Sequence, residues 1–124
     1  MTLLHGYWRS SAAYRLRIAL NLKGIEFGQL SVNLKDGHQR EAAHRALHPQ
    51  GFVPVLNIDD EQLIQSPAIL EYLEETRPEP PLLPGSAAER SRLRAYAAVI
   101  GCDIHPVQNL RILQYLRNAF GQDA

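Results

Sequence analysis

The sequence has little that would tie the protein to an oxidising compartment, a membrane or a polyanion. Its single cysteine, Cys102, excludes an internal disulfide and a CxxC redox pair. No apolar run approaches the roughly 20 residues that span a bilayer. Its 13 basic and 13 acidic residues balance, which gives no electrostatic reason to bind nucleic acid. At 124 residues the chain has the length of one domain and slightly more.

The histidines argue against a metalloprotein, and the start of the chain argues against a secreted protein. His5, His44 and His48 lack the spacing of metal ligands, so we expect no metal site. The segment 1–6 is too short for a secretory leader and is followed by charged sequence. We therefore predict a cytoplasmic protein with no nucleic-acid, membrane or metal partner.

Hydrophobic periodicity and turn residues predict an α/β domain over residues 1–78. We expect strands at 3–8, 27–34, 54–58 and 62–65, and helices at about 11–23, 39–47 and 67–76. An acidic turn at Asp59-Asp60 joins the last two strands into a hairpin. The resulting order, βαβαββα, is that of the thioredoxin-like fold.

A second, helical region follows a proline-rich linker at 79–86. Ser86 and Glu89 match a capping box, which predicts a helix that opens a second domain at 87–124. The helical pattern runs to about Phe120, and Pro106 predicts a kink or a break in it. Its apolar positions need a partner surface; they are Leu93, Ala97, Ile100, Ile104, Val107, Leu110, Leu113 and Leu116.

The most informative motif combines Val53-Pro54 with Gln65-Ser66-Pro67. If the bond before Pro54 is cis, the turn leaves the Val53 amide and carbonyl facing outward, where an extended peptide can pair with them. Ser66 precedes a proline and reads as a helix N-cap, and a helix N-terminus receives carboxylates. The motif therefore predicts a site for a small extended peptide with an acidic end, a description that glutathione fits.

These motifs resemble the zeta class of glutathione transferases, which includes maleylacetoacetate and maleylpyruvate isomerases. The resemblance covers essentially the whole chain; it rests on WRSS at 8–11, RLRIAL at 15–20, VP at 53–54, QSPAI at 65–69, YLEE at 72–75 and GCDIHPVQN at 101–109. It implies a thioredoxin-like N-terminal domain followed by the first helices of an all-α C-terminal domain, which in the family is longer. In one departure, Ala12 stands where the family usually has cysteine.

The resemblance also implies the residues that hold glutathione. Ser11, supported by Ser10, would stabilise the thiolate of glutathione, because a hydroxyl donor and a helix N-terminus both lower a thiol pKa. The alternative is that both serines are only helix caps. The other expected cofactor-binding residues are Val53 and Pro54 for the cysteinyl backbone, Gln65 and Ser66 for the γ-glutamyl end, His38 for the glycine carboxylate, and Gln108 and Asn109.

The expected substrate residues are Arg9, His105 and Arg111. Arginine suits a substrate that carries carboxylates, and Arg9 is also counted with the catalytic serines because it adjoins them. Each arginine has the alternative of a solvated surface charge, and His105 that of helix packing. Arg15 and Arg17 are expected to anchor the first helix by ion pairs.

The activity that the resemblance implies is glutathione-dependent cis–trans isomerisation of maleylacetoacetate or maleylpyruvate, in the breakdown of aromatic compounds. Glutathione adds to the cis double bond, allows rotation and leaves again, so it acts as a cofactor. One alternative is a general transferase acting on electrophiles or α-halo acids; another is a non-catalytic glutathione-binding module. The family also implies a homodimer, with which the apolar helical stripe agrees.

Overall fold

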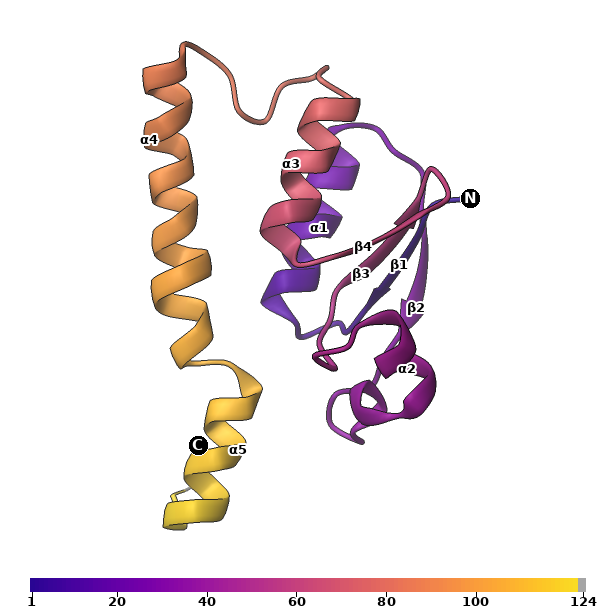
Figure 1. Ribbon diagram of the computed structural model, residues 1–124, viewed down its shortest axis with the longest axis vertical. Coiled ribbons are helices and arrows are strands. Elements are labelled where there is room, and N and C mark those ends of the chain that lie inside the picture. Colours follow the sequence, from indigo (N-terminus) through magenta and orange to yellow (C-terminus); the bar gives the residue numbers. More distant parts are fainter. Residues whose placement is uncertain (123–124) are drawn as a thin grey trace. The chain divides into compact units, whose positions relative to one another are not determined.

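The computed structural model describes residues 1–122 and divides into two compact units, Met1–Leu82 and a second that starts at Leu83 (Figure 1). The division falls inside the proline-rich segment 79–86. The first unit contains a sheet with helices, and the second contains helices alone. Within residues 1–122, none of the helices has the length and apolar content to cross a membrane.

The first unit is built on a four-stranded sheet with the order β2-β1-β3-β4. The strands are β1 (Leu3–Gly6), β2 (Gly28–Ser31), β3 (Val55–Ile58) and β4 (Glu61–Ile64). The helices are α1 (Ser11–Leu22), the 3₁₀ turn η1 (His38–Arg40), α2 (Ala42–Leu47) and α3 (Ser66–Thr76). β1 runs parallel to β2 and antiparallel to β3, which pairs antiparallel with β4. The predicted βαβαββα order is confirmed.

The hydrophobic core lies between the sheet and the two helices α1 and α3, which Figure 1 shows on one side of the strands. Alternate strand residues point to opposite faces, so Leu4 and Leu56 face these helices while their neighbours face away. The helices contribute apolar side chains at helical spacing; those that are essentially buried are Leu16, Ala19, Leu20, Ile69 and Leu73.

The opposite face of the sheet carries both apolar side chains, such as that of Val55, and polar ones, such as that of His5. His5 on β1 is buried there, and so are His44 on α2 and His48 just after it. The His44 Nε2–H donates to the Phe52 carbonyl at 2.7 Å. Burial, and secondarily the nearness of His44, lowers the pKa of both His5 and His48. Residues 1–122 contain no group of three or more His, Cys, Asp or Glu side chains that could hold a metal ion.

Two details of the first unit differ from the prediction. Strands β1 and β2 are shorter than expected, with four residues each. The single helix expected at 39–47 is divided into η1 and α2, because Glu41 takes an extended conformation (φ −63°, ψ 147°) between them. The hairpin is as predicted, since Asp59 and Asp60 both have positive φ and join β3 to β4 in a two-residue loop.

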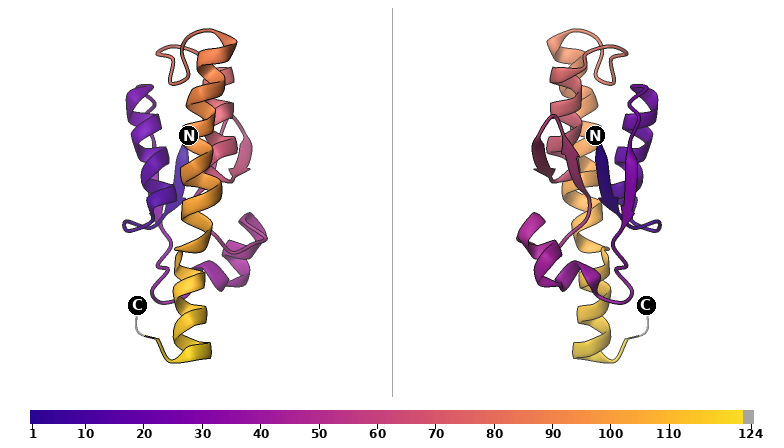
Figure 2. Two further views of the ribbon diagram at one scale, coloured as in Figure 1. Left: turned by 90° about the vertical axis from the view of Figure 1, so that its left-hand side faces the viewer. Right: turned by 90° about the vertical axis from the view of Figure 1, so that its right-hand side faces the viewer.

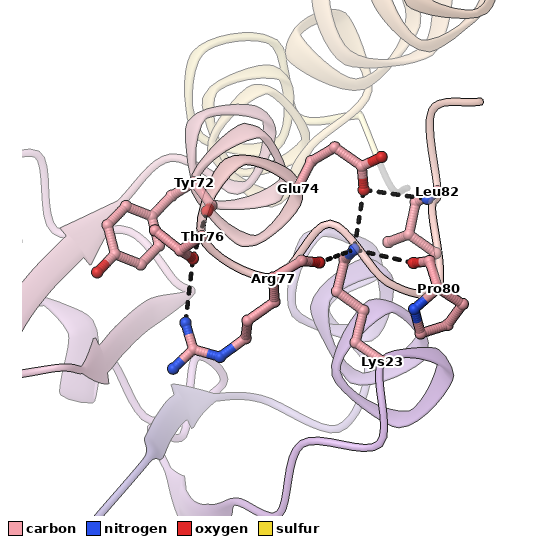
Figure 3. A network of polar contacts seen from close by, with 7 residues as sticks. All are labelled: Lys23, Tyr72, Glu74, Thr76, Arg77, Pro80 and Leu82. Atoms are coloured by element: carbon pink, nitrogen blue, oxygen red, sulfur yellow. Dashed lines mark hydrogen bonds and ion pairs between the residues drawn. The ribbon is translucent and has the colours of Figure 1, made fainter. Parts of the chain in front are cut away.

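A buried lysine holds the chain that follows α3 (Figure 3). The Lys23 Nζ lies 2.9 Å from a Glu74 carboxylate oxygen and donates to the carbonyls of Arg77 at 2.6 Å and Pro80 at 3.0 Å. The same Glu74 oxygen accepts from the Leu82 amide at 3.0 Å. The Lys23 side chain is fully buried and that of Glu74 is 9% exposed, so this ion pair is almost completely desolvated but well provided with hydrogen bonds.

The second unit begins with the predicted capping box. The Ser86 Oγ accepts from the Glu89 amide, and the Glu89 carboxylate accepts from the Ser86 amide at 2.7 Å. These contacts open α4 (Ala87–Ala98), which continues through a π-helical turn (Val99–Ile104) and a 3₁₀ turn (His105–Val107) before α5 (Leu110–Phe120), as Figure 2 shows. The predicted break at Pro106 is therefore confirmed. The apolar stripe is 37–67% exposed at Leu93, Ile100, Ile104, Val107, Leu110, Leu113 and Leu116.

Candidate functional site

The first part of the candidate site is the start of α1. Ser10 is the N-cap, and its Oγ accepts from the Ala13 amide at 3.1 Å. The capping role that was the alternative for Ser10 is thus present, but a hydroxyl that accepts one bond still has its proton to donate. Ser11 is the first residue of the helix and is exposed. The structure therefore gives the two serines different positions, with Ser10 capping the helix and Ser11 in its first turn.

The loop before α1 carries an aromatic and a cationic side chain at the surface. Trp8 is 72% exposed, and the Arg9 guanidinium lies 5.6 Å from the centre of its ring. The Arg17 Nη2 donates to the Trp8 carbonyl at 3.2 Å and so ties this loop to α1. The prediction of an ion pair for Arg17 is wrong, because its guanidinium donates to a backbone carbonyl instead of to a carboxylate.

The second part is the strand edge before β3. The Val53–Pro54 peptide bond is cis. Pro54 is buried, whereas Val53 is only half-buried. Within residues 1–122, the Val53 amide and carbonyl make no hydrogen bond. An extended peptide that passes this edge can therefore pair with Val53 as an added strand does.

The third part is the start of α3. The predicted N-cap at Ser66 is wrong: Gln65 takes φ 68° and ψ 106°, so the helix begins with Ser66 and has Pro67 second. No side chain caps this end, whereas α1, α4 and α5 all have a side-chain cap. The Gln65 Nε2 donates to the Gln50 Oε1 at 2.6 Å, which orients that side chain. Positive φ at a residue other than glycine is uncommon and gathers at functional sites.

Arg15 joins the first and third parts and was missed as a site residue. Its Nη1 donates to the Ser66 Oγ at 2.7 Å, from α1 to α3, in place of the expected ion pair. Ser66 is only 4% exposed. One signal was available in the sequence: Arg15 follows Ser11 by four residues, which places both on one face of a helix.

The remaining predicted residues lie elsewhere. His38 is exposed on η1, 4.0 Å from the Glu41 carboxylate. Four belong to the second unit, where they are close in sequence. His105 is in the 3₁₀ turn, and Gln108 follows that turn. Asn109 caps α5 by accepting from the Ile112 amide at 3.4 Å, and Arg111 is in the first turn of α5. Their binding roles stay predictions.

The first unit fits an extended peptide with a terminal carboxylate. Val53 offers one amide and one carbonyl for backbone pairing, and the uncapped start of α3 offers donors and the positive end of a helix dipole to an anion. The hydroxyls of Ser10 and Ser11 at the start of α1 offer donors to a second anion, such as a thiolate.

Comparison with known proteins gives consistent matches. Residues 1–75 match the family described as "Glutathione S-transferase, N-terminal domain". A maleylpyruvate isomerase from a Ralstonia species is 53% identical over 120 residues, which are 97% of this chain and 57% of that protein. The holo structure of a maleyl pyruvate isomerase, a bacterial zeta-class glutathione S-transferase, has a TM-score of 0.95 at 53% identity, over 98% of this chain and 57% of its own.

A maleylacetoacetate isomerase from Methylobacterium extorquens AM1, solved with bound malonate and GSH, has a TM-score of 0.93 at 45% identity, over 97% of this chain and 56% of its own. The chain therefore spans little more than half the length of these relatives.

Proposed function

Because the chain belongs to the glutathione S-transferase family through its N-terminal domain, we propose that it binds glutathione and serves a glutathione-dependent isomerase of maleylacetoacetate or maleylpyruvate. The observation that carries this proposal is the uncapped start of α3. There the buried Ser66 hydroxyl and the positive end of the helix dipole can bind an anion, and the Val53 backbone nearby makes no hydrogen bond within residues 1–122. The relatives named as such isomerases support the choice of reaction.

The residues of the first unit have distinct roles in this proposal. Ser66 and Gln65 hold the γ-glutamyl end, and Val53 pairs with the backbone of the cysteine. When bound, glutathione supplies the thiolate that adds reversibly to the double bond of the substrate. Ser11 donates to the sulfur and so favours the anion at neutral pH, with Ser10 in support.

The substrates carry carboxylates and need cationic groups. Arg9 is exposed next to Ser10, where it can neutralise charge that develops on the substrate. His105 and Arg111 of the second unit are proposed to contact the substrate, and Gln108 and Asn109 to contact glutathione. His38 is proposed to contact the glycine carboxylate. A homodimer and a cytoplasmic location complete the proposal; the exposed apolar stripe of the second unit supports the dimer.

The test measures binding and turnover separately on the 124-residue chain. Titration calorimetry with glutathione should show binding, and the chain should accelerate isomerisation of maleylpyruvate or maleylacetoacetate above the rate with glutathione alone. Ser11→Ala should keep most of the glutathione affinity but lower the rate by about 10²-fold, within the range of lost transition-state donors. Ser91→Ala, on an exposed part of α4, is the matched control and should change neither.

Other outcomes would replace the proposal. A chain that does not bind glutathione contradicts it outright. Turnover of an α-halo acid without isomerisation would indicate a general transferase. Binding with no turnover of any of these substrates would indicate a glutathione-binding module.

A further inference from the structure

The Arg15 guanidinium is a cation without a carboxylate partner. It is half-buried on α1, and its hydrogen bond goes to the neutral Ser66 hydroxyl at 2.7 Å. Across residues 1–122, no Asp or Glu forms an ion pair with it. A half-buried guanidinium with a neutral partner leaves positive charge at the start of α3 that nothing in the described chain balances.

The bond from Arg15 also decides what the Ser66 hydroxyl can do. A guanidinium only donates, so the Ser66 Oγ must act as the acceptor in this pair. The hydroxyl proton then points elsewhere, and none of the described residues accepts it. Ser66 is 4% exposed, and a buried donor without an acceptor is costly. The pair is therefore arranged for an external acceptor.

We propose that Arg15 is a positioning residue for the acidic end of the ligand: it fixes Ser66 as a hydrogen-bond donor and adds a positive charge beside the start of α3. This inference rests on the proposed glutathione site and adds a residue and a rule of specificity to it. The rule is that Arg15 acts on the α-carboxylate of the γ-glutamyl residue. Ligands that lack this carboxylate gain nothing from Arg15.

The starts of α1 and α3 illustrate the difference that Arg15 makes. Ser10 accepts from an amide of its own helix, so its oxygen is used to cap the start of α1. Ser66 accepts from Arg15 of a different helix, 51 positions earlier in the chain, and leaves the amides of its own helix without a side-chain acceptor. A serine that caps its helix shields the N-terminus, whereas Ser66 leaves it open to a carboxylate.

The experiment compares Arg15→Met with the unmodified 124-residue chain by calorimetric titration with three tripeptides. The first is glutathione. The second has a 4-aminobutyryl group in place of the γ-glutamyl group and lacks only the α-carboxylate. The third has a glutaryl group and lacks only the α-amine. Arg15→Met should weaken binding of glutathione and the glutaryl tripeptide about ten-fold, but binding of the 4-aminobutyryl tripeptide less than about three-fold.

Two further variants separate positioning from a structural effect. Arg15→Lys keeps the charge and a hydrogen-bond donor but not the planar fork, so it should recover part of the lost affinity for glutathione. Arg45→Met removes an exposed charge from α2 and should leave binding of all three ligands unchanged. Circular dichroism should show that each variant is folded.

The outcomes are distinct. Equal losses of affinity for all three tripeptides, or no loss for any, would overturn the role of Arg15 while leaving the glutathione site intact. An unmodified chain that binds none of them would instead overturn the glutathione site, and with it this inference.

Discussion

The two ends of the α1–α3 helix pair are held by similar contacts that serve different purposes. At one end Arg15 of α1 reaches Ser66 of α3; at the other, Lys23 just after α1 reaches Glu74 of α3. The second contact lies eight residues beyond the first on both segments, which is about 12 Å at 1.5 Å per residue. The two contacts therefore show that α1 and α3 run in the same direction.

The ends differ in how completely their polar groups are satisfied. At the Lys23 end the ammonium has three acceptors, and Glu74 also accepts from the Leu82 amide, so an added ligand has nothing to bind. At the Arg15 end the cation has a neutral partner, and the hydroxyl of Ser66 has no acceptor in the described chain. A saturated buried network contributes to a unique fold, whereas an unsaturated one is available for binding.

The largest effect is expected at the saturated end. Lys23→Met leaves the Glu74 carboxylate buried without its cation, so we expect the free energy of unfolding to fall by about 3–5 kcal/mol. Urea unfolding followed by circular dichroism measures this change. Lys35→Met, at an exposed turn, is the matched control and should stay within about 0.5 kcal/mol of the unmodified chain. A loss below about 1 kcal/mol for Lys23→Met would show that this end does not hold the fold.

A smaller effect is expected for the serines at the starts of the two helices: Ser10 should matter more for stability and Ser66 more for glutathione binding. Ser10→Ala removes the cap of α1 and should lower the free energy of unfolding by about 1 kcal/mol. Ser66→Ala should lower it less, because the bond lost from Arg15 is offset by removal of a buried hydroxyl proton that has no acceptor among the described residues, but it should weaken glutathione binding about ten-fold. Thermal unfolding measures the change in stability of both variants, and calorimetric titration measures the change in their affinity for glutathione. The distinction between a capped and an open helix start fails if the two variants change both quantities alike.

The most gradual effect is expected from pH and concerns the other face of the sheet. Burial lowers the pKa of His5 and of His48, so in acid the unfolded chain binds more protons than the folded chain. Stability is therefore fully retained above the ordinary histidine pKa of about 6.5 and is lost as the pH falls below it. Urea unfolding between about pH 7.5 and pH 5.5 should show this loss.

The neighbouring groups sharpen the pH test. His44 lies close enough to lower both pKa values further, and the nearby Asn57 side chain acts in the opposite direction on the pKa of His5. The combined variant His5→Gln and His48→Gln should have a flatter pH profile, whereas Lys35→Met, at an exposed turn, should leave the slope unchanged. A profile that is flat in the unmodified chain contradicts the assignment to these histidines.

Much of the fold follows from local patterns in the sequence. The alternation of apolar residues and the turn at Asp59-Asp60 predicted the strands and their hairpin, and the capping box at Ser86 predicted the start of α4. The motifs at Val53-Pro54 and Gln65-Ser66 indicated a glutathione transferase, and WRSS at 8–11 and GCDIHPVQN at 101–109 narrowed the resemblance to the zeta class, which the family match and the solved structures confirm. These features depend on residues that are close together in the chain.

What sequence reasoning missed depends on contacts between distant residues. Arg15 and Ser66 are 51 positions apart, as are Lys23 and Glu74, and no local pattern pairs them. The positive φ of Gln65 has a similar origin: glutamine has no preference for it, so only the surrounding structure can hold it there. The misplaced N-cap at Ser66 followed directly from this, because the chain turns one residue earlier than serine and proline suggest.

The exposed Trp8 has a practical consequence. It is the one tryptophan in the sequence, it is 72% exposed, and it lies two residues before Ser10. Excitation of the indole therefore produces an emission signal that originates beside the candidate site and nowhere else in the chain. The protein carries its own optical probe, with which ligand titrations can be followed without any attached dye.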